Sequence, residues 1–60
     1  MSGYTVTFSI DMIDELCDNP SQYKTWQIRE AVNDAMVHYE YGNASHQWYE
    51  YVVMKLKPYT

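Results

Sequence analysis

Three residues of this chain carry side chains that could serve as a proton donor or acceptor, a nucleophile or a metal ligand near neutral pH: Cys17, His38 and His46. A histidine exchanges a proton in this pH range, and a cysteine thiolate attacks electrophiles. The three are scattered along the chain without the paired spacing of a zinc site, and no phosphate-loop, nucleophile-elbow or metalloprotease motif accompanies them. We therefore predict a protein that is not an enzyme, with no catalytic residue, no metal and no cofactor.

Each of the three also fits a structural role. Cys17 is typical of a small hydrophobic residue that closes a short helix, and a single cysteine cannot form an internal disulfide. His38 lies at the border of an apolar helical stripe, where we expect a partly buried structural histidine. His46 begins the last element of the chain and is expected to face solvent.

Acidic side chains form a second candidate group. The chain has eight acidic and four basic residues, a formal net charge of −4, and most of its carboxylates lie between positions 11 and 40, whereas Lys55 and Lys57 lie near the other end. This balance disfavours direct nucleic-acid binding, which needs cationic groups to neutralise phosphates. The carboxylates form either a solvated helical surface or an acidic surface that complements a basic groove on another protein. On the second interpretation, the partner-binding carboxylates are Asp14, Glu15, Asp18, Glu30 and Asp34.

Large aromatic side chains are concentrated between positions 46 and 59, and they exceed what the core of a 60-residue chain can bury. Tryptophan and tyrosine dominate binding hot spots because they combine a large area with few rotamers. Base stacking would be a rival use, but it normally accompanies a basic groove. We predict that Trp48, Tyr49 and Tyr51 bind protein, either a second copy of the chain or a target.

A strand, a short helix and a long helix are expected to precede the last element and to position these groups. Residues 4–10 alternate between apolar and hydroxyl side chains, as in a half-buried strand. Asp11 is expected to cap a short helix over residues 12–17. A long helix is expected from Thr25, with Gly42 just after its last turn and with Glu30 and Asp34 pointing away from its apolar side. The apolar stripe of this helix consists of Ile28, Ala31, Val32, Ala35 and Tyr39.

The last element is interpreted as a second strand, because Val52, Met54 and Leu56 alternate with other residues and the segment is rich in aromatic and β-branched side chains. A bulge near Glu50 would switch the faces of its first half. The alternative for residues 37–50 is a hairpin, with the long helix ending near Met36. We leave both arrangements open.

These elements predict an α+β fold in a single domain, residues 1–60, with the order β-α-α-β, one strand at each end, and one short and one long amphipathic helix. Two strands leave open edges and a chain of this length buries a marginal core, so we expect a homodimer to complete the sheet. The chain has no apolar run of membrane-spanning length and no signal-peptide pattern. With one free thiol, this predicts a cytoplasmic protein that does not bind membranes.

Residues 4–41 resemble the ribbon-helix-helix family of DNA-binding proteins. The segments "YTVTFSI" and "TWQIREAV" match the strand and the start of the second helix in that family. The resemblance implies an obligate dimer whose paired strands enter the major groove, with Thr5, Thr7 and Ser9 facing the bases and the region of Thr25 touching phosphate.

The chain also resembles, as a class, small acidic phage-encoded inhibitors of host machinery, members of which block RNA polymerase, uracil-DNA glycosylase or CRISPR effectors. One inhibitor of RNA polymerase is similar in outline, with a helix of "E-A-x-x-x-A" spacing and a strand that ends in basic residues and proline. The residues that carry this likeness are Glu30, Ala31, Ala35, Lys55, Lys57 and Pro58.

Acidity, surplus aromatic residues and missing catalytic motifs favour the second resemblance. We predict an acidic protein-binding module of a bacterial host cell's cytoplasm that inhibits or sequesters a host protein, such as a nucleic-acid-processing enzyme or an antiviral defence complex. The alternative is a dimeric DNA-binding regulator of the ribbon-helix-helix type.

Overall fold

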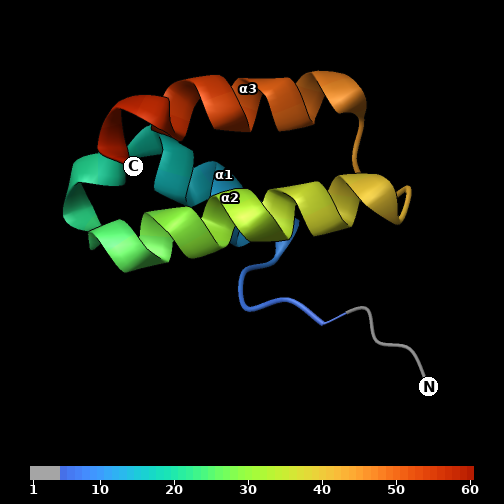
Figure 1. Ribbon diagram of the computed structural model, residues 1–60, viewed down its shortest axis with the longest axis horizontal. Helices are drawn as coiled ribbons and strands as arrows, with labels where there is room; N and C mark the ends of the chain where they lie inside the picture. The colour runs from blue at the N-terminus through green and yellow to red at the C-terminus, as the bar shows by residue number, and fades with distance from the viewer. Residues whose placement is uncertain (1–4) are drawn as a thin grey trace.

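The computed structural model describes residues 5–60, and within that range the chain forms three α-helices and no β-strand (Figure 1). The helices are α1 (Ile10–Asp18), α2 (Thr25–Glu40) and α3 (His46–Leu56). A 3-10 turn, η1 (Pro20–Gln22), follows α1, and another, η2 (Lys57–Tyr59), follows α3. The predicted α+β fold is therefore wrong, and so is a sheet completed by dimerisation. Tyr4, where the first strand was expected to begin, lies outside the described residues.

Helix α1 is longer than the predicted span of 12–17 because its N-cap is Ser9 and not Asp11. The Ser9 hydroxyl oxygen accepts a hydrogen bond from the Met12 backbone N–H at 3.2 Å, which satisfies one of the free donors of the first turn. Asp11 lies within that turn, where a carboxylate interacts favourably with the helix dipole. The inward residues of α1 are Ile13, Leu16 and Cys17.

Helix α2 confirms the long amphipathic helix predicted from Thr25. Gly42, with a φ of +82°, ends it in the left-handed conformation that glycine adopts at little cost. The Gly42 N–H donates to the Tyr39 carbonyl at 3.0 Å and the Asn43 N–H to the His38 carbonyl at 2.9 Å, the pair of bonds of a Schellman motif. Because α2 continues to Glu40, the alternative hairpin over residues 37–50 is wrong.

Helix α3 occupies the segment predicted to be the second strand. Its N-cap is Ser45, whose hydroxyl accepts a hydrogen bond from the Trp48 N–H at 3.1 Å. Val52 and Leu56 are fully buried one turn apart, and Trp48 is half-buried one turn before them. The same residues that alternate along a strand thus also satisfy a helical spacing of four, and it is the helix that packs.

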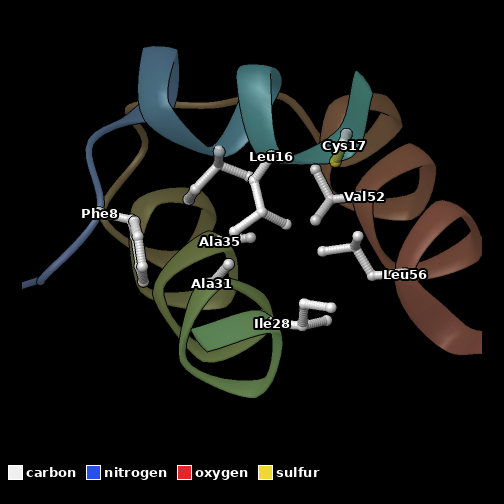
Figure 2. Packing of buried hydrophobic residues seen from close by; sticks show 9 residues of the cluster. Phe8, Leu16, Cys17, Ile28, Ala31, Ala35, Val52 and Leu56 are labelled. Atoms are coloured by element: carbon white, nitrogen blue, oxygen red, sulfur yellow. The ribbon is translucent and has the colours of Figure 1, made fainter. Parts of the chain in front are cut away.

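The three helices enclose one core. Figure 1 shows α2 and α3 side by side and antiparallel, with α1 behind them, and α1 contacts both. Ala31 and Ala35 let α2 approach its neighbours closely, while the larger side chains of α1 and α3 fill the space between (Figure 2). The buried cluster consists of Phe8, Ile13, Leu16, Cys17, Ile28, Ala31, Ala35, Val52 and Leu56.

Residues 5–9 precede α1 as a non-regular segment that is anchored by Phe8, which is only 7% exposed. The N–H groups of Thr7 and Phe8 both donate to Oδ2 of Asp34 at 2.9 Å, and the Phe8 carbonyl is 2.9 Å from Nε2 of His38. The predicted first strand is therefore replaced by a segment whose backbone groups bind side chains of α2. These groups are not free to pair with a strand of a second copy.

Candidate protein-binding surfaces

Asp34 and His38 form a buried polar pair one helical turn apart on α2. Asp34 is 1% exposed and His38 is 4% exposed. A carbonyl oxygen only accepts hydrogen bonds, so His38 Nε2 carries the proton that it shares with the Phe8 carbonyl. Asp34 and His38 together therefore bind three backbone groups of the N-terminal segment: the N–H groups of Thr7 and Phe8 and the Phe8 carbonyl.

This arrangement changes the interpretation of Asp34, which was predicted to point away from the apolar stripe and to contact a partner. That exposure is wrong, because the carboxyl group turns inward to meet a backbone segment that has folded back onto α2. The sequence offered one relevant signal, the spacing of four between Asp34 and His38 beside the buried Ala31 and Ala35. His38 was expected to be partly buried, and the structure buries it almost completely, with Nε2 bound to the Phe8 carbonyl.

Three of the predicted carboxylates lie together on α1. Asp14, Glu15 and Asp18 are exposed, and Asp11, which the prediction did not include, is exposed on the same helix. We call these four residues the acidic face of α1. Within residues 5–60 none of them forms an ion pair with a lysine or arginine. The helix thus combines a fully apolar inner side with an outer side that carries only negative charge.

Asp14 connects the acidic face to α3. Its Oδ1 accepts a hydrogen bond of 2.8 Å from the indole Nε1 of Trp48. Asp14 and Trp48 were both predicted to bind a partner, and the structure brings them together. The bond fixes the orientation of Trp48 and leaves the Asp14 carboxylate exposed.

The acidic face also influences the free thiol of Cys17. Burial raises the pKa of Cys17, and the carboxylates of Asp14 and Asp18 raise it further, to about 11. A thiol with this pKa is protonated at neutral pH, and its side chain is fully enclosed. Cys17 therefore lacks both the thiolate and the access that a nucleophile requires.

Glu30 lies apart from these residues, on α2. It is half-buried, and its Oε2 is 3.4 Å from the Thr7 hydroxyl, which donates to it. Glu30 therefore borders the N-terminal segment.

Two of the three predicted aromatic anchors pack against the core. Tyr49 stacks on Tyr39 of α2 with ring centroids 5.4 Å apart and an interplanar angle of 7°. Trp48 meets His38 edge to face at 6.4 Å. Both Trp48 and Tyr49 are half-buried, so they join α3 to the other helices. Tyr51 alone among the three is an exposed side chain, at 44%.

An apolar ridge runs along the outer side of α3, and its most exposed residue, Met54, was not predicted. Met54 is 76% exposed, and Tyr51 lies one turn before it. Shallow hollows flank this ridge: one is lined by Gln47, Glu50, Tyr51, Met54 and Lys55, and the other by His46, Tyr49, Glu50, Val53 and Met54. We call Tyr51 and Met54 the α3 ridge. Once α3 is known to be a helix, their spacing identifies them as neighbours on one side.

No family model, curated protein or solved structure matches this chain significantly. No group of three or more histidine, cysteine or acidic residues in the described part of the chain is arranged to hold a metal ion. Among residues 5–60, no helix has the length and apolar character needed to cross a bilayer.

Proposed function

We propose that this protein is a non-enzymatic binding module that attaches the acidic face of α1 to a basic surface of another protein and thereby inhibits or sequesters it. The observation that carries the proposal is the density of exposed carboxylates on α1: Asp11, Asp14, Glu15 and Asp18 within a nine-residue helix that has no basic residue in its last turn. A uniform charge of this kind accelerates encounter with a basic partner and disfavours acidic ones.

The requirements of folding explain Asp11, near the positive end of the helix dipole, and Asp14, which binds Trp48, but they do not explain Asp18. Asp18 lies in the last turn of α1, where a carboxylate faces the negative end of the helix dipole and costs about 0.3–1 kcal/mol. Asp14 and Asp18 also add to the charge around the buried Cys17. A surface needed only for solubility would be served as well by carboxylates elsewhere or by mixed charges.

The partner that fits is a protein with a concentrated positive surface, and nucleic-acid-processing enzymes and defence complexes carry such grooves. The proposal places the interaction in the cytoplasm of a bacterial host cell, and it assigns no direct binding of nucleic acid to this chain. The ribbon-helix-helix alternative is disfavoured, because it requires a strand where Thr7 and Phe8 are bound to α2.

An affinity capture from bacterial lysate, run with and without nuclease, tests the proposal. We expect one stoichiometric protein that remains bound after nuclease treatment and that is released by salt, as for an electrostatic interface. Recovery of nucleic acid that disappears with nuclease, or capture of no protein other than the chain itself, would contradict it.

The role of the acidic face is tested with a pair of charge reversals and the purified captured protein. Glu15→Lys changes the acidic face, and Glu40→Lys makes the same change in charge at an exposed position near the end of α2. We expect Glu15→Lys to slow association by about tenfold at low salt and Glu40→Lys to slow it by about twofold or less. Equal effects of the two variants would show that net charge, and not this face, determines binding.

A further inference from the structure

We propose that the α3 ridge is the contact surface of a weak two-fold homodimer in which the α3 helices of two copies pack antiparallel. The inference goes beyond the proposed function, since it concerns a different surface and a different partner. It starts from the most exposed apolar side chain among residues 5–60, Met54, and from its neighbour Tyr51.

The charges beside the ridge have opposite signs at its two ends. Glu50 lies one turn before Met54, and its carboxylate is 3.7 Å from the imidazole of His46. Lys57, the C-cap of α3, keeps helical backbone angles and follows Glu50 by about two turns, so Glu50 and Lys57 are on the same side of the ridge. The other side repeats the order: Asp14 is bound to Trp48 near the start of α3, and Lys55 follows near its end. Each side of the ridge is therefore acidic toward the start of α3 and basic toward its end.

This distribution of charge is complementary to its own copy when the two α3 helices run in opposite directions. A two-fold axis perpendicular to α3 places the start of one helix opposite the end of the other, and the same patch on both copies forms the contact. Glu50 of each copy then faces Lys57 of the other. A parallel pair would instead place carboxylate opposite carboxylate and lysine opposite lysine, which is unfavourable.

The shape of the surface also favours a second copy of the chain as the partner. The hollows on the two sides of Met54 can receive protruding side chains, and the ridge itself supplies Met54 and Tyr51 as the protruding side chains of the second copy. In this arrangement Met54 and Tyr51 of each copy leave solvent together. A helix of 11 residues offers a small contact, so we expect a dissociation constant between about 10 µM and 1 mM.

Sedimentation equilibrium on the full chain, over about the same concentration range, tests the dimer. We expect wild-type protein to pass from monomer to dimer, and Met54→Lys to weaken association by about tenfold or more. Met36→Lys is the matched control, because Met36 is an exposed methionine of α2, and we expect it to associate within about twofold of wild type. A wild-type chain that stays monomeric throughout, or an equal loss in both variants, would overturn the proposal.

The antiparallel register is tested by charge exchange. Glu50→Lys places two lysines opposite each other at both ends of the contact, and Lys57→Glu places two carboxylates there, so each variant alone is expected to associate about tenfold more weakly. In an equimolar mixture, a dimer of one Glu50→Lys chain and one Lys57→Glu chain pairs a lysine with a carboxylate at both ends. We therefore expect the mixture to associate within about threefold of wild type. Circular dichroism checks that both variants remain helical. Single variants that associate like wild type, or a mixture that does not recover, would overturn the antiparallel contact.

Discussion

The carboxyl group of Asp34 and the imidazole of His38 supply, for one short backbone segment, the hydrogen bonds that a neighbouring strand would otherwise provide. One oxygen of Asp34 accepts the N–H groups of Thr7 and Phe8, and His38 donates to the Phe8 carbonyl. A buried backbone donor that loses its partner costs about 1–3 kcal/mol. The attachment of the N-terminal segment, and with it the burial of Phe8, therefore depends on this pair.

Replacing Asp34 with alanine is expected to lower the free energy of unfolding by about 2–3 kcal/mol, because the N–H groups of Thr7 and Phe8 lose their acceptor. Asp34→Asn keeps one acceptor oxygen and should lose less. Urea denaturation followed by circular dichroism measures both. Asn33→Ala, at the exposed neighbouring position, serves as the control and should change stability by less than about 0.5 kcal/mol. An Asp34→Ala variant as stable as this control would contradict the structural role of the pair.

Cys17 makes the stability of the fold depend on pH in alkaline solution. Burial, Asp14 and Asp18 raise its pKa from 9.0 to about 11 in the folded state. Between these values the unfolded chain loses the thiol proton and the folded chain keeps it, so rising pH favours unfolding. The contribution of Cys17 is complete below pH 9 and is lost as pH passes 11, a decrease of about 2–3 kcal/mol.

The Cys17→Ala variant isolates this contribution, since the two proteins differ only in this side chain. We expect the difference in unfolding free energy between wild type and Cys17→Ala to shrink as pH rises from 8 to about 11. Urea denaturation at several pH values measures this difference. A difference that stays constant with pH would mean that the thiol ionises equally easily in both states.

At the level of single elements, α2 could be predicted from the sequence and α3 could not. The stripe of Ile28, Ala31 and Ala35 has only a helical interpretation, and Gly42 marks its end. In α3 the set of Trp48, Val52 and Leu56 fits a helix, whereas Val52 and Leu56 also fit an alternating strand with β-branched and aromatic neighbours. What decides between them is tertiary: a helix at this place buries Val52 and Leu56 against α1 and α2, while a strand would need a partner.

The same distinction applies to the candidate sites. A short helix with Asp14 and Glu15 on its outer side could be predicted from the spacing of residues 12–17, but Asp18 was placed beyond its end and Asp11 at its cap. The burial of Asp34 could not be predicted, since it depends on residues 5–9 returning to α2, a contact between segments far apart in the sequence. Met54 was missed because α3 was predicted to be a strand. In a strand Met54 shares a face with Val52 and Leu56, whereas in the helix those two residues are buried and Met54 is exposed.

Capping provides a direct test that the segment after Gly42 is a helix. Ser45→Ala removes the acceptor of the Trp48 N–H and is expected to lower the free energy of unfolding by about 1 kcal/mol. Ser21→Ala, at an exposed serine of η1, is the control and should be nearly neutral. Thermal and urea denaturation measure both variants. If the two serines prove equivalent, Ser45 does not cap a helix in solution.

The molecule as a whole is small enough for a second copy to affect its stability measurably. Nine apolar side chains of residues 5–60 form its buried core, and a chain of this length has a small margin between hydrophobic burial and chain entropy. The acidic face of α1 and the α3 ridge lie on different helices and border each other at Asp14, which binds Trp48. Asp11, Glu15 and Asp18 can therefore bind a basic partner while the ridge is occupied by a copy. A dimer would then present two acidic faces to its targets.

Dimerisation through the α3 ridge predicts a melting temperature that depends on protein concentration. Association stabilises the folded chain by mass action, and in a domain of this size about 1 kcal/mol corresponds to a shift of roughly 4–8 °C. We expect the melting temperature of wild type to rise by several degrees between about 10 µM and 1 mM, as followed by circular dichroism. Met54→Lys, which alters a side chain that is 76% exposed and not part of the core, should melt at the low-concentration wild-type temperature throughout. If the melting temperatures of both proteins rise equally with concentration, the association takes place elsewhere on the molecule. If neither melting temperature depends on concentration, the ridge stays in solvent.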